Sequence, residues 1–183
     1  MTWSIIARDS ETGQFGIAVA TKFFAVGARV PHIAAGIGGV ATQALVNPYY
    51  GIDGVKLLRE GRESCDIVKT LIASDSGRES RQLHIMDAAG RIAAMQAGEA
   101  SGGDKRGKQS AALLIHGDEE WSDLDLRVDD HADPLSELER LEQVSRERWV
   151  HFRTYLPTRK NPAGVTDRAT IDAGIEAAAT GKA

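Results

Sequence analysis

The order of hydrophobic and polar positions predicts two β-strands near the start of the chain. These strands are residues 2–8 and 14–22, and the turn-forming residues 9–13 separate them. Two strands around a short polar loop predict a β-hairpin. Residues 23–31 are then expected to continue extended and to return through residues 32–42, which are rich in alanine and glycine.

Two helices are predicted next, because the apolar residues change to helical spacing. The first covers residues 50–59 and ends before Gly61. Ser64 is expected to cap the second helix. Its apolar face would consist of Ile67, Val68, Leu71 and Ile72.

The second half of the chain returns to strand patterns. Residues 82–87 and 91–95 predict a hairpin, 110–116 a buried strand, and 124–128 an edge strand. The pair Asp133-Pro134 then predicts the start of a helix, since proline is favoured at the first helical position. Helices grouped between runs of strands predict an α+β fold with antiparallel sheets covered by helices.

The length of 183 residues fits one domain, expected over residues 1–158. Residues 159–183 are expected to form a loosely attached or partly disordered C-terminal tail. The net charge of −4 argues against a nucleic-acid partner. Since no leader or membrane-spanning run is found, we expect a cytoplasmic protein without a membrane partner. Cys65 is the single cysteine and is expected to serve packing.

Thr2 is the first candidate for chemistry. If Met1 is removed, the α-amine of Thr2, with an unperturbed pKa near ~8, can accept the proton of its own hydroxyl. Lys22 ends the second predicted strand, and its ammonium would lower the pKa of that amine further. The alternative is that Thr2 is only a β-branched residue at the start of a strand. An intact Met1 would block the chemical role.

Two glycine-rich segments resemble nucleotide motifs in part. Residues 36–41 match G-x-G-x-x-G/A, which predicts dinucleotide binding only between a strand and a helix, so a glycine-lined strand end remains the competing interpretation. Residues 102–109 resemble a P-loop, but Gln109 replaces the Ser or Thr that holds Mg²⁺. This loop is either an anion-binding segment or a solvated turn.

The acidic segment around His131 contains residue types that bind metals. Asp129 and His131 would share one face of a strand, which cannot surround an ion. We therefore expect no metal, and expect Asp133 to cap the following helix. No cofactor is expected either.

Several segments together resemble the DUF1028 family over residues 1 to about 158. They are MTWSIIARD, GIAVATKFFAVGARVP, GVATQALVNPYYG, GRESRQLHIMDAAGR, GGDKRGKQSAALL and DLRVDDHADPLSELERL. The resemblance implies an Ntn-hydrolase-like fold, a four-layer αββα sandwich similar in plan to proteasome β-subunits. It implies no established reaction.

The resemblance also implies roles for residues in the matched motifs. Thr2 would be the nucleophile of an amide hydrolase, and Lys22 would tune its amine. The backbone N–H groups of Thr42 and Gln43 would stabilise an oxyanion. The remaining candidates would contact an unknown small-molecule or peptide-like substrate, the basic ones through an acidic group: Thr21, Asn47, Lys105, Arg106, Lys108, Gln109 and Ser110. The competing hypothesis is a non-catalytic binding or assembly protein that keeps the fold.

Two further expectations concern assembly and completeness. Trp149, Phe152, Tyr155 and Leu156 offer more apolar surface than one helix buries, so a homo-oligomer, and most simply a dimer, is expected.

Family members usually carry an additional segment after residues 91–95. Here the chain runs from Gln96 directly into the glycine-rich loop, which predicts a deletion, or a Cα separation above the normal 3.8 Å or so between residues 95 and 101.

Overall fold

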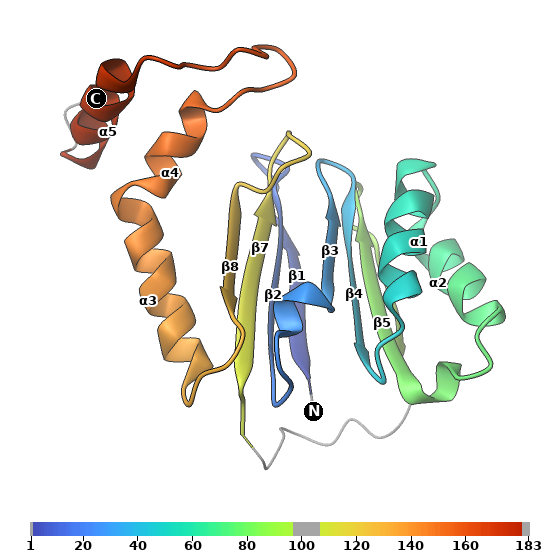
Figure 1. Ribbon diagram of the computed structural model, residues 1–183. Coiled ribbons are helices and arrows are strands. Elements are labelled where there is room, and N and C mark those ends of the chain that lie inside the picture. The colour runs from blue at the N-terminus through green and yellow to red at the C-terminus, as the bar shows by residue number, and fades with distance from the viewer. Residues whose placement is uncertain (1, 97–106, 181–183) are drawn as a thin grey trace. The chain divides into compact units, whose positions relative to one another are not determined.

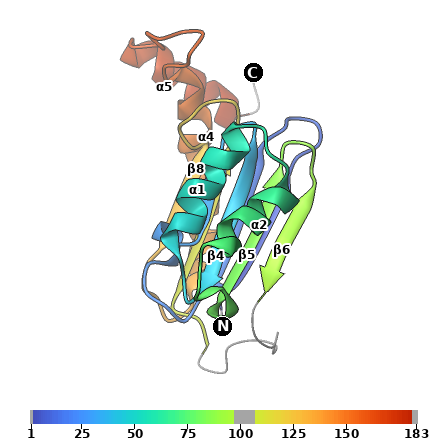
Figure 2. The same ribbon diagram turned by 90° about the vertical axis from the view of Figure 1, so that its right-hand side faces the viewer.

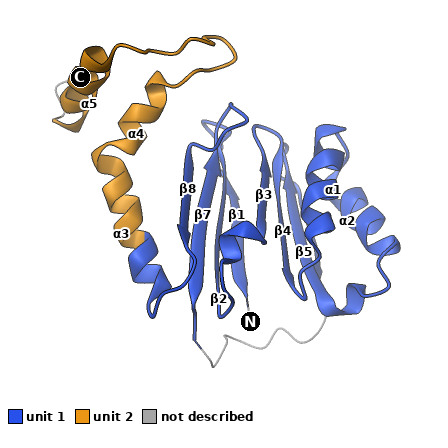
Figure 3. Ribbon diagram, viewed as in Figure 1, with its two compact units in different colours: residues 1–138 blue, residues 139–183 orange. Residues whose placement is uncertain are grey.

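The structure, a computed structural model, describes residues 2–96 and 107–180 of the chain. It divides into two compact units, residues 1–138 and 139–183, which are described separately (Figure 3). The first unit is a mixed α/β structure with two antiparallel sheets. Residues 97–101, which carry most of the predicted deletion or wide Cα separation, fall outside the described residues, as do the candidates Lys105 and Arg106.

The first sheet contains the predicted N-terminal hairpin. Strand β1 (Trp3–Arg8) pairs with β2 (Phe15–Thr21), with Trp3 opposite Ala20 and Arg8 opposite Phe15. Strands β7 (Ser110–His116) and β8 (Leu124–Val128) complete the order β1-β2-β7-β8. The hairpin and the two later strands are therefore confirmed.

The second sheet has the order β3-β4-β5-β6. Its strands are β3 (Pro31–Ala34), β4 (Gly38–Ala44), β5 (Arg81–Asp87) and β6 (Ile92–Gln96). A short 3₁₀ helix, η2 (Arg78–Ser80), precedes β5.

Helices α1 (Pro48–Arg59) and α2 (Ser64–Ala73) cover the outer face of the second sheet (Figures 1 and 2). The apolar side chains between these helices and the sheet form one core cluster: Val40, Tyr50, Leu58, Ile67, Val68, Leu71, Leu83 and Ile85. Each such burial stabilises the fold by about 1.5–3 kcal/mol.

The two sheets face each other across a second core (Figure 1). Its buried residues come from both sheets and from the segment after β2: Ile17, Val19, Val26, Val30, Ala41 and Ala112. The backbone of β4 approaches the first sheet closely at Gly39. A Cβ atom at this position would lie 3.2 Å from the side chain of Ile6 and 3.3 Å from that of Ile17, so a side chain here would have to displace one or both slightly.

Two sequence predictions about helix starts need correction. The first helix begins at Pro48 rather than Tyr50, because the side chain of Asn47 accepts the N–H of Tyr49 and proline suits the first turn. Ser64 does not cap the second helix. It is the first helical residue, after Glu63 as N-cap, and its N–H donates to Asp87 at 3.3 Å.

The segment after β2 is also not extended as predicted. It contains the 3₁₀ helix η1 (Val26–Ala28), and Ala25 before it has a left-handed conformation with φ 54°. A non-glycine residue in this region costs about 1 kcal/mol or more, so surrounding contacts must hold it. The N–H of Ala25 donates to the carbonyl of Asp129 at 3.0 Å.

The second unit contains most of α3 (Pro134–Glu147), then α4 (Trp149–Phe152), η3 (Arg153–Tyr155) and α5 (Arg168–Ala179). Asp167 caps α5 by accepting the N–H of Thr170 at 2.9 Å. Tyr155 lies so close to Gly174 that a Cβ atom there would overlap its hydroxyl. Part of the apolar surface used to predict an oligomer is thus covered within this unit. The predicted domain boundary at residue 158 stays a prediction.

Candidate functional site

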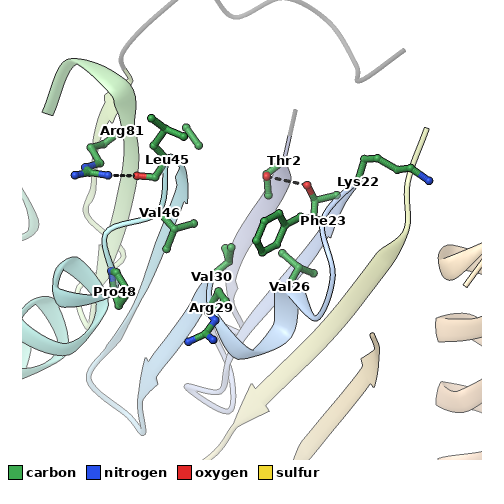
Figure 4. A pocket seen from close by; sticks show the side chains of 12 residues that line it. Thr2, Lys22, Phe23, Val26, Arg29, Val30, Leu45, Val46, Pro48 and Arg81 are labelled. Carbon is green, nitrogen blue, oxygen red and sulfur yellow. Dashed lines mark hydrogen bonds between the residues drawn. The ribbon is translucent and has the colours of Figure 1, made fainter. Parts of the chain in front are cut away.

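A pocket of about 590 Å³ lies where corresponding ends of the two sheets meet (Figure 4). One wall comes from the start of the chain and the segment after β2, the other from the end of β4, the start of α1 and the start of β5. Its lining residues are Thr2, Thr21, Lys22, Phe23, Val26, Arg29, Val30, Ala44, Leu45, Val46, Pro48 and Arg81. This volume is typical of small-molecule sites, and most of the lining is apolar.

Thr2 precedes β1 and faces the end of β2. Its hydroxyl oxygen lies 3.0 Å from that of Thr21, which is buried. The carbonyl of Thr2 accepts a hydrogen bond from the Gln43 side chain at 3.4 Å. Antiparallel pairing of β1 and β2 therefore brings two predicted site residues, Thr2 and Thr21, into polar contact, although they are 19 positions apart in the sequence.

Lys22 lines the same pocket, but its side chain extends away from Thr2 (Figure 4). Lys22 makes no ion pair with any residue that the structure describes. A rotation of the side chain is needed before its ammonium can influence the Thr2 amine.

Thr42 does not line the pocket. It is fully buried, its hydroxyl donates to the carbonyl of Asn47 at 3.3 Å, and its N–H donates to Val30 at 3.3 Å. The donor that was predicted to stabilise an oxyanion is therefore already used within the fold, and that role stays a prediction. Gln43 also lies outside the lining, and its side chain links Thr2 to Gln82.

Ser110 and Gln109 support the pocket from outside. The buried Ser110 hydroxyl accepts the N–H of Val26 at 3.2 Å and donates to the carbonyl of Phe23. The N–H of Gln109 donates to the carbonyl of Thr21 at 2.7 Å. Both residues were predicted to bind substrate. They instead fix the segment that forms one wall, and the exposed Lys108 does not line the pocket.

The opposite wall is held by the carboxylate of Asp75. It accepts hydrogen bonds from Tyr50 at 2.8 Å, Arg81 at 3.1 Å and Asn47 at 3.2 Å. Arg81 also donates to the carbonyl of Leu45. Asn47, predicted to contact substrate, is thus a helix cap and a wall support.

These bonds shift the pKa values of the acid and the phenol in opposite directions. The Tyr50 hydroxyl, the Gly77 N–H and Arg81 hold the pKa of Asp75 well below its usual range. Burial and the Asp75 hydrogen bond raise the pKa of Tyr50 to about 12. Asp75 therefore stays ionised and Tyr50 stays protonated at neutral pH.

Ala44 at the pocket has a left-handed backbone, with φ 67°. With Ala25 it is one of two non-glycine residues of positive φ in the described ranges, and both belong to segments that form this pocket. Such strain concentrates at functional sites. Sequence reasoning missed Ala44, Phe23, Arg29 and Arg81, because their places depend on contacts between distant segments.

A smaller cavity of about 180 Å³ lies elsewhere between the sheets, lined by Ser4, Ile5, Ile6, His84, Ile85, Met86 and Ile92. The hydroxyl of Ser4 donates to Gln43 at 2.6 Å and lies 3.3 Å from Nε2 of His84. Burial lowers the pKa of His84. The two cavities are thus joined by a chain of polar side chains that ends at the Thr2 carbonyl.

The dinucleotide hypothesis does not survive the geometry. Residues 36–41 form the turn between β3 and β4 and the first part of β4, so the helix that a dinucleotide motif needs is replaced by a strand. Within residues 2–96 and 107–180, no three His, Cys, Asp or Glu side chains gather closely enough to hold a metal. Asp133 instead accepts the N–H of Ser136 at 3.3 Å, as expected of a capping residue.

None of the helices in the described ranges is long and apolar enough to span a bilayer.

Comparisons with known proteins agree with the resemblance seen in the sequence. A crystal structure of a DUF1028 protein from Silicibacter pomeroyi is 26% identical, with a TM-score of 0.80 over 91% of this chain and 99% of that chain. No curated protein matches the chain. The model of the DUF1028 family, described as a family of unknown function, matches residues 2–94 and 91–138. The two matched stretches overlap at residues 91–94 and together cover residues 2–138, which shows that the chain belongs to the DUF1028 family.

Proposed function

We propose that this protein is an amide hydrolase of the N-terminal-nucleophile type, with Thr2 as the nucleophile. The observation that carries the proposal is the hydroxyl of Thr2, which enters a pocket of small-molecule size and contacts the Thr21 hydroxyl at 3.0 Å. The two facing antiparallel sheets, with α1 and α2 outside one of them, fit an Ntn-hydrolase-like sandwich.

The reaction requires Thr2 to be the first residue of the mature protein. Its free amine takes the hydroxyl proton while the oxygen attacks the amide carbonyl carbon. The C–N bond of the substrate then breaks, and the leaving amine receives the proton. Water hydrolyses the resulting ester, releases the acid and regenerates the hydroxyl. Thr21 orients the attacking oxygen through the hydrogen bond between the two hydroxyl groups.

The developing oxyanion needs a donor other than Thr42. We assign this role to the backbone N–H of Val46, which belongs to a lining residue and makes no hydrogen bond within the described part of the chain. A single well-placed donor lowers the activation free energy by about 2.7–4 kcal/mol. The strained backbone of Ala44, two residues earlier, sets the direction of this segment.

The proposal is tested by mass spectrometry of the purified full chain. The intact mass shows whether Met1 has been removed, and a β-lactone probe then reports the nucleophile. We expect Thr2→Ser to retain labelling and Thr2→Ala to lose it. Thr12→Ala, in the exposed turn between β1 and β2, is the matched control and should label like the parent.

The second candidate function is a non-catalytic binding protein, favoured by the side chain of Lys22 turning away from Thr2. A retained Met1, or labelling unaffected by Thr2→Ala, would favour that function. For either function we propose a homodimer, and a monomer mass in light scattering would contradict it.

A further inference from the structure

The described lining of the pocket carries positive charge. Lys22, Arg29 and Arg81 line it, and among the lining residues that the structure describes there is no Asp or Glu. Arg81 is neutralised by Asp75 at 3.1 Å. Arg29, in contrast, makes no ion pair with any described residue. The pocket thus presents, beside apolar walls, one guanidinium that pairs with no carboxylate in the described part of the chain.

Arg29 is held in place by its backbone. It follows η1, and its N–H donates to the carbonyl of Val26 at 3.0 Å. The neighbouring Val30 is 1% exposed and also donates to Val26, at 3.1 Å. Ser110 fixes the start of this turn. The Cα of Arg29 is therefore anchored to the core while its side chain remains exposed, as a ligand-binding arginine requires.

The arrangement of the lining places apolar surface between the cation and the nucleophile. In the view of Figure 4, the side chains of Phe23 and Val30 lie between those of Thr2 and Arg29. Phe23 is 63% exposed, so it offers its ring to a ligand rather than to the core. A molecule that reaches from Thr2 to Arg29 would bury an apolar segment against both residues.

We propose that the pocket selects carboxylate-bearing amides, in which an apolar segment separates the scissile amide from a second, ionised carboxylate held by Arg29. This substrate class rests on the proposed function of Thr2. A planar guanidinium binds a carboxylate through two parallel hydrogen bonds, which a neutral amide of the same shape cannot reproduce. Lys22 also lines the pocket and adds positive charge, but no ion pair with a described residue fixes the position of its ammonium. Binding of the carboxylate by Arg29 does not depend on catalysis at Thr2.

The test measures binding, so it does not depend on turnover. The probes are 4-phenylbutanoate and its neutral isostere 4-phenylbutanamide, titrated into the full chain by calorimetry in low salt. We expect the carboxylate to bind about tenfold more tightly than the amide, as is typical of one charge-assisted pair. Arg29→Gln should remove that preference. Arg59→Gln, at the exposed end of α1, is the matched control and should retain it.

Thr2→Ala separates this inference from the proposed function. If Thr2 is the nucleophile, this variant loses probe labelling but keeps the preference for the carboxylate. If the parent protein is never labelled at Thr2, the catalytic proposal is wrong. If Arg29→Gln nevertheless loses carboxylate binding, the anion site at Arg29 is still supported. Equal binding of the two probes, binding of neither, or an unchanged preference in Arg29→Gln would overturn the inference, provided that thermal melting shows the variant to be folded.

Discussion

The hydroxyl oxygens of Thr2 and Thr21 lie 3.0 Å apart across the first pair of strands. Thr21 is 5% exposed, so its hydroxyl has little access to water and directs the hydroxyl of Thr2. Replacing Thr21 by valine keeps the shape and removes this contact. We expect the rate of β-lactone labelling at Thr2 to fall about tenfold, since one hydrogen bond contributes about 0.5–1.5 kcal/mol. Thr21→Ser should largely restore it. Equal rates in the valine and serine variants would contradict the role of the hydroxyl.

Ser110→Ala tests whether the wall of the pocket depends on a buried hydroxyl. The variant leaves the N–H of Val26 and the carbonyl of Phe23 without their partner. We expect a loss of about 1–3 kcal/mol in the free energy of unfolding, measured by urea denaturation. Ser10→Ala, in the exposed turn after β1, is the control and should stay within about 0.5 kcal/mol of the parent.

Asp75→Asn tests the opposite wall through its pH dependence. A carboxyl group whose pKa is lowered by folding stabilises the folded state above its unfolded pKa, near ~4. This stabilisation is lost as the pH falls through the folded pKa. We therefore expect the variant to melt below the parent at pH 7, and the difference between the two melting temperatures to shrink progressively as the pH falls below about 4. Asp66→Asn, exposed on α2, should show neither effect. A constant difference down to pH 3 would exclude Asp75 as the cause.

Two strand glycines make a matched pair for testing how tightly the second sheet is packed. A Cβ atom at Gly38 would lie 2.5 Å from the backbone oxygen of Met86, whereas the nearest atom to a Cβ at Gly16 would be 3.7 Å away. Backbone cannot move aside as a side chain can. Gly38→Ala should therefore destabilise by about 2 kcal/mol in chemical denaturation. Gly16→Ala should change stability much less, and equal losses would show that the contact at Met86 relaxes.

Much of the fold could be predicted from local patterns. The strand-like residues 2–8 and 14–22 around the polar turn 9–13 were enough for the first hairpin, because hairpin pairing is local. The start of α1 was missed although Asn47-Pro48 carried the signal, a capping side chain followed by proline. The turn at Ala25 had no such signal, because alanine shows no preference for positive φ and long-range contacts impose it.

The candidate site was predictable only in part for the same reason. Thr2 and Thr21 could be predicted as site residues from the sequence, because the pairing of strands in a hairpin is local. Arg29 and Arg81 could not be predicted as site residues. Arg29 lies on a turn that was expected to be extended, and Arg81 reaches the pocket through the pairing of β5 with β4. Ser110 was identified as a residue of interest, yet its role as a support depends on a contact 84 positions away in sequence.

The close approach of β4 to the first sheet at Gly39 has a consequence for how specificity can evolve. The two walls of the pocket belong to different sheets, and Gly39, Ile6 and Ile17, which lie close together between these sheets, do not line it. A change at Gly39, Ile6 or Ile17 would therefore alter the width of the pocket while leaving every lining residue the same. Relatives with identical linings can thus accept substrates of different girth, and a comparison of lining residues alone would not reveal the difference.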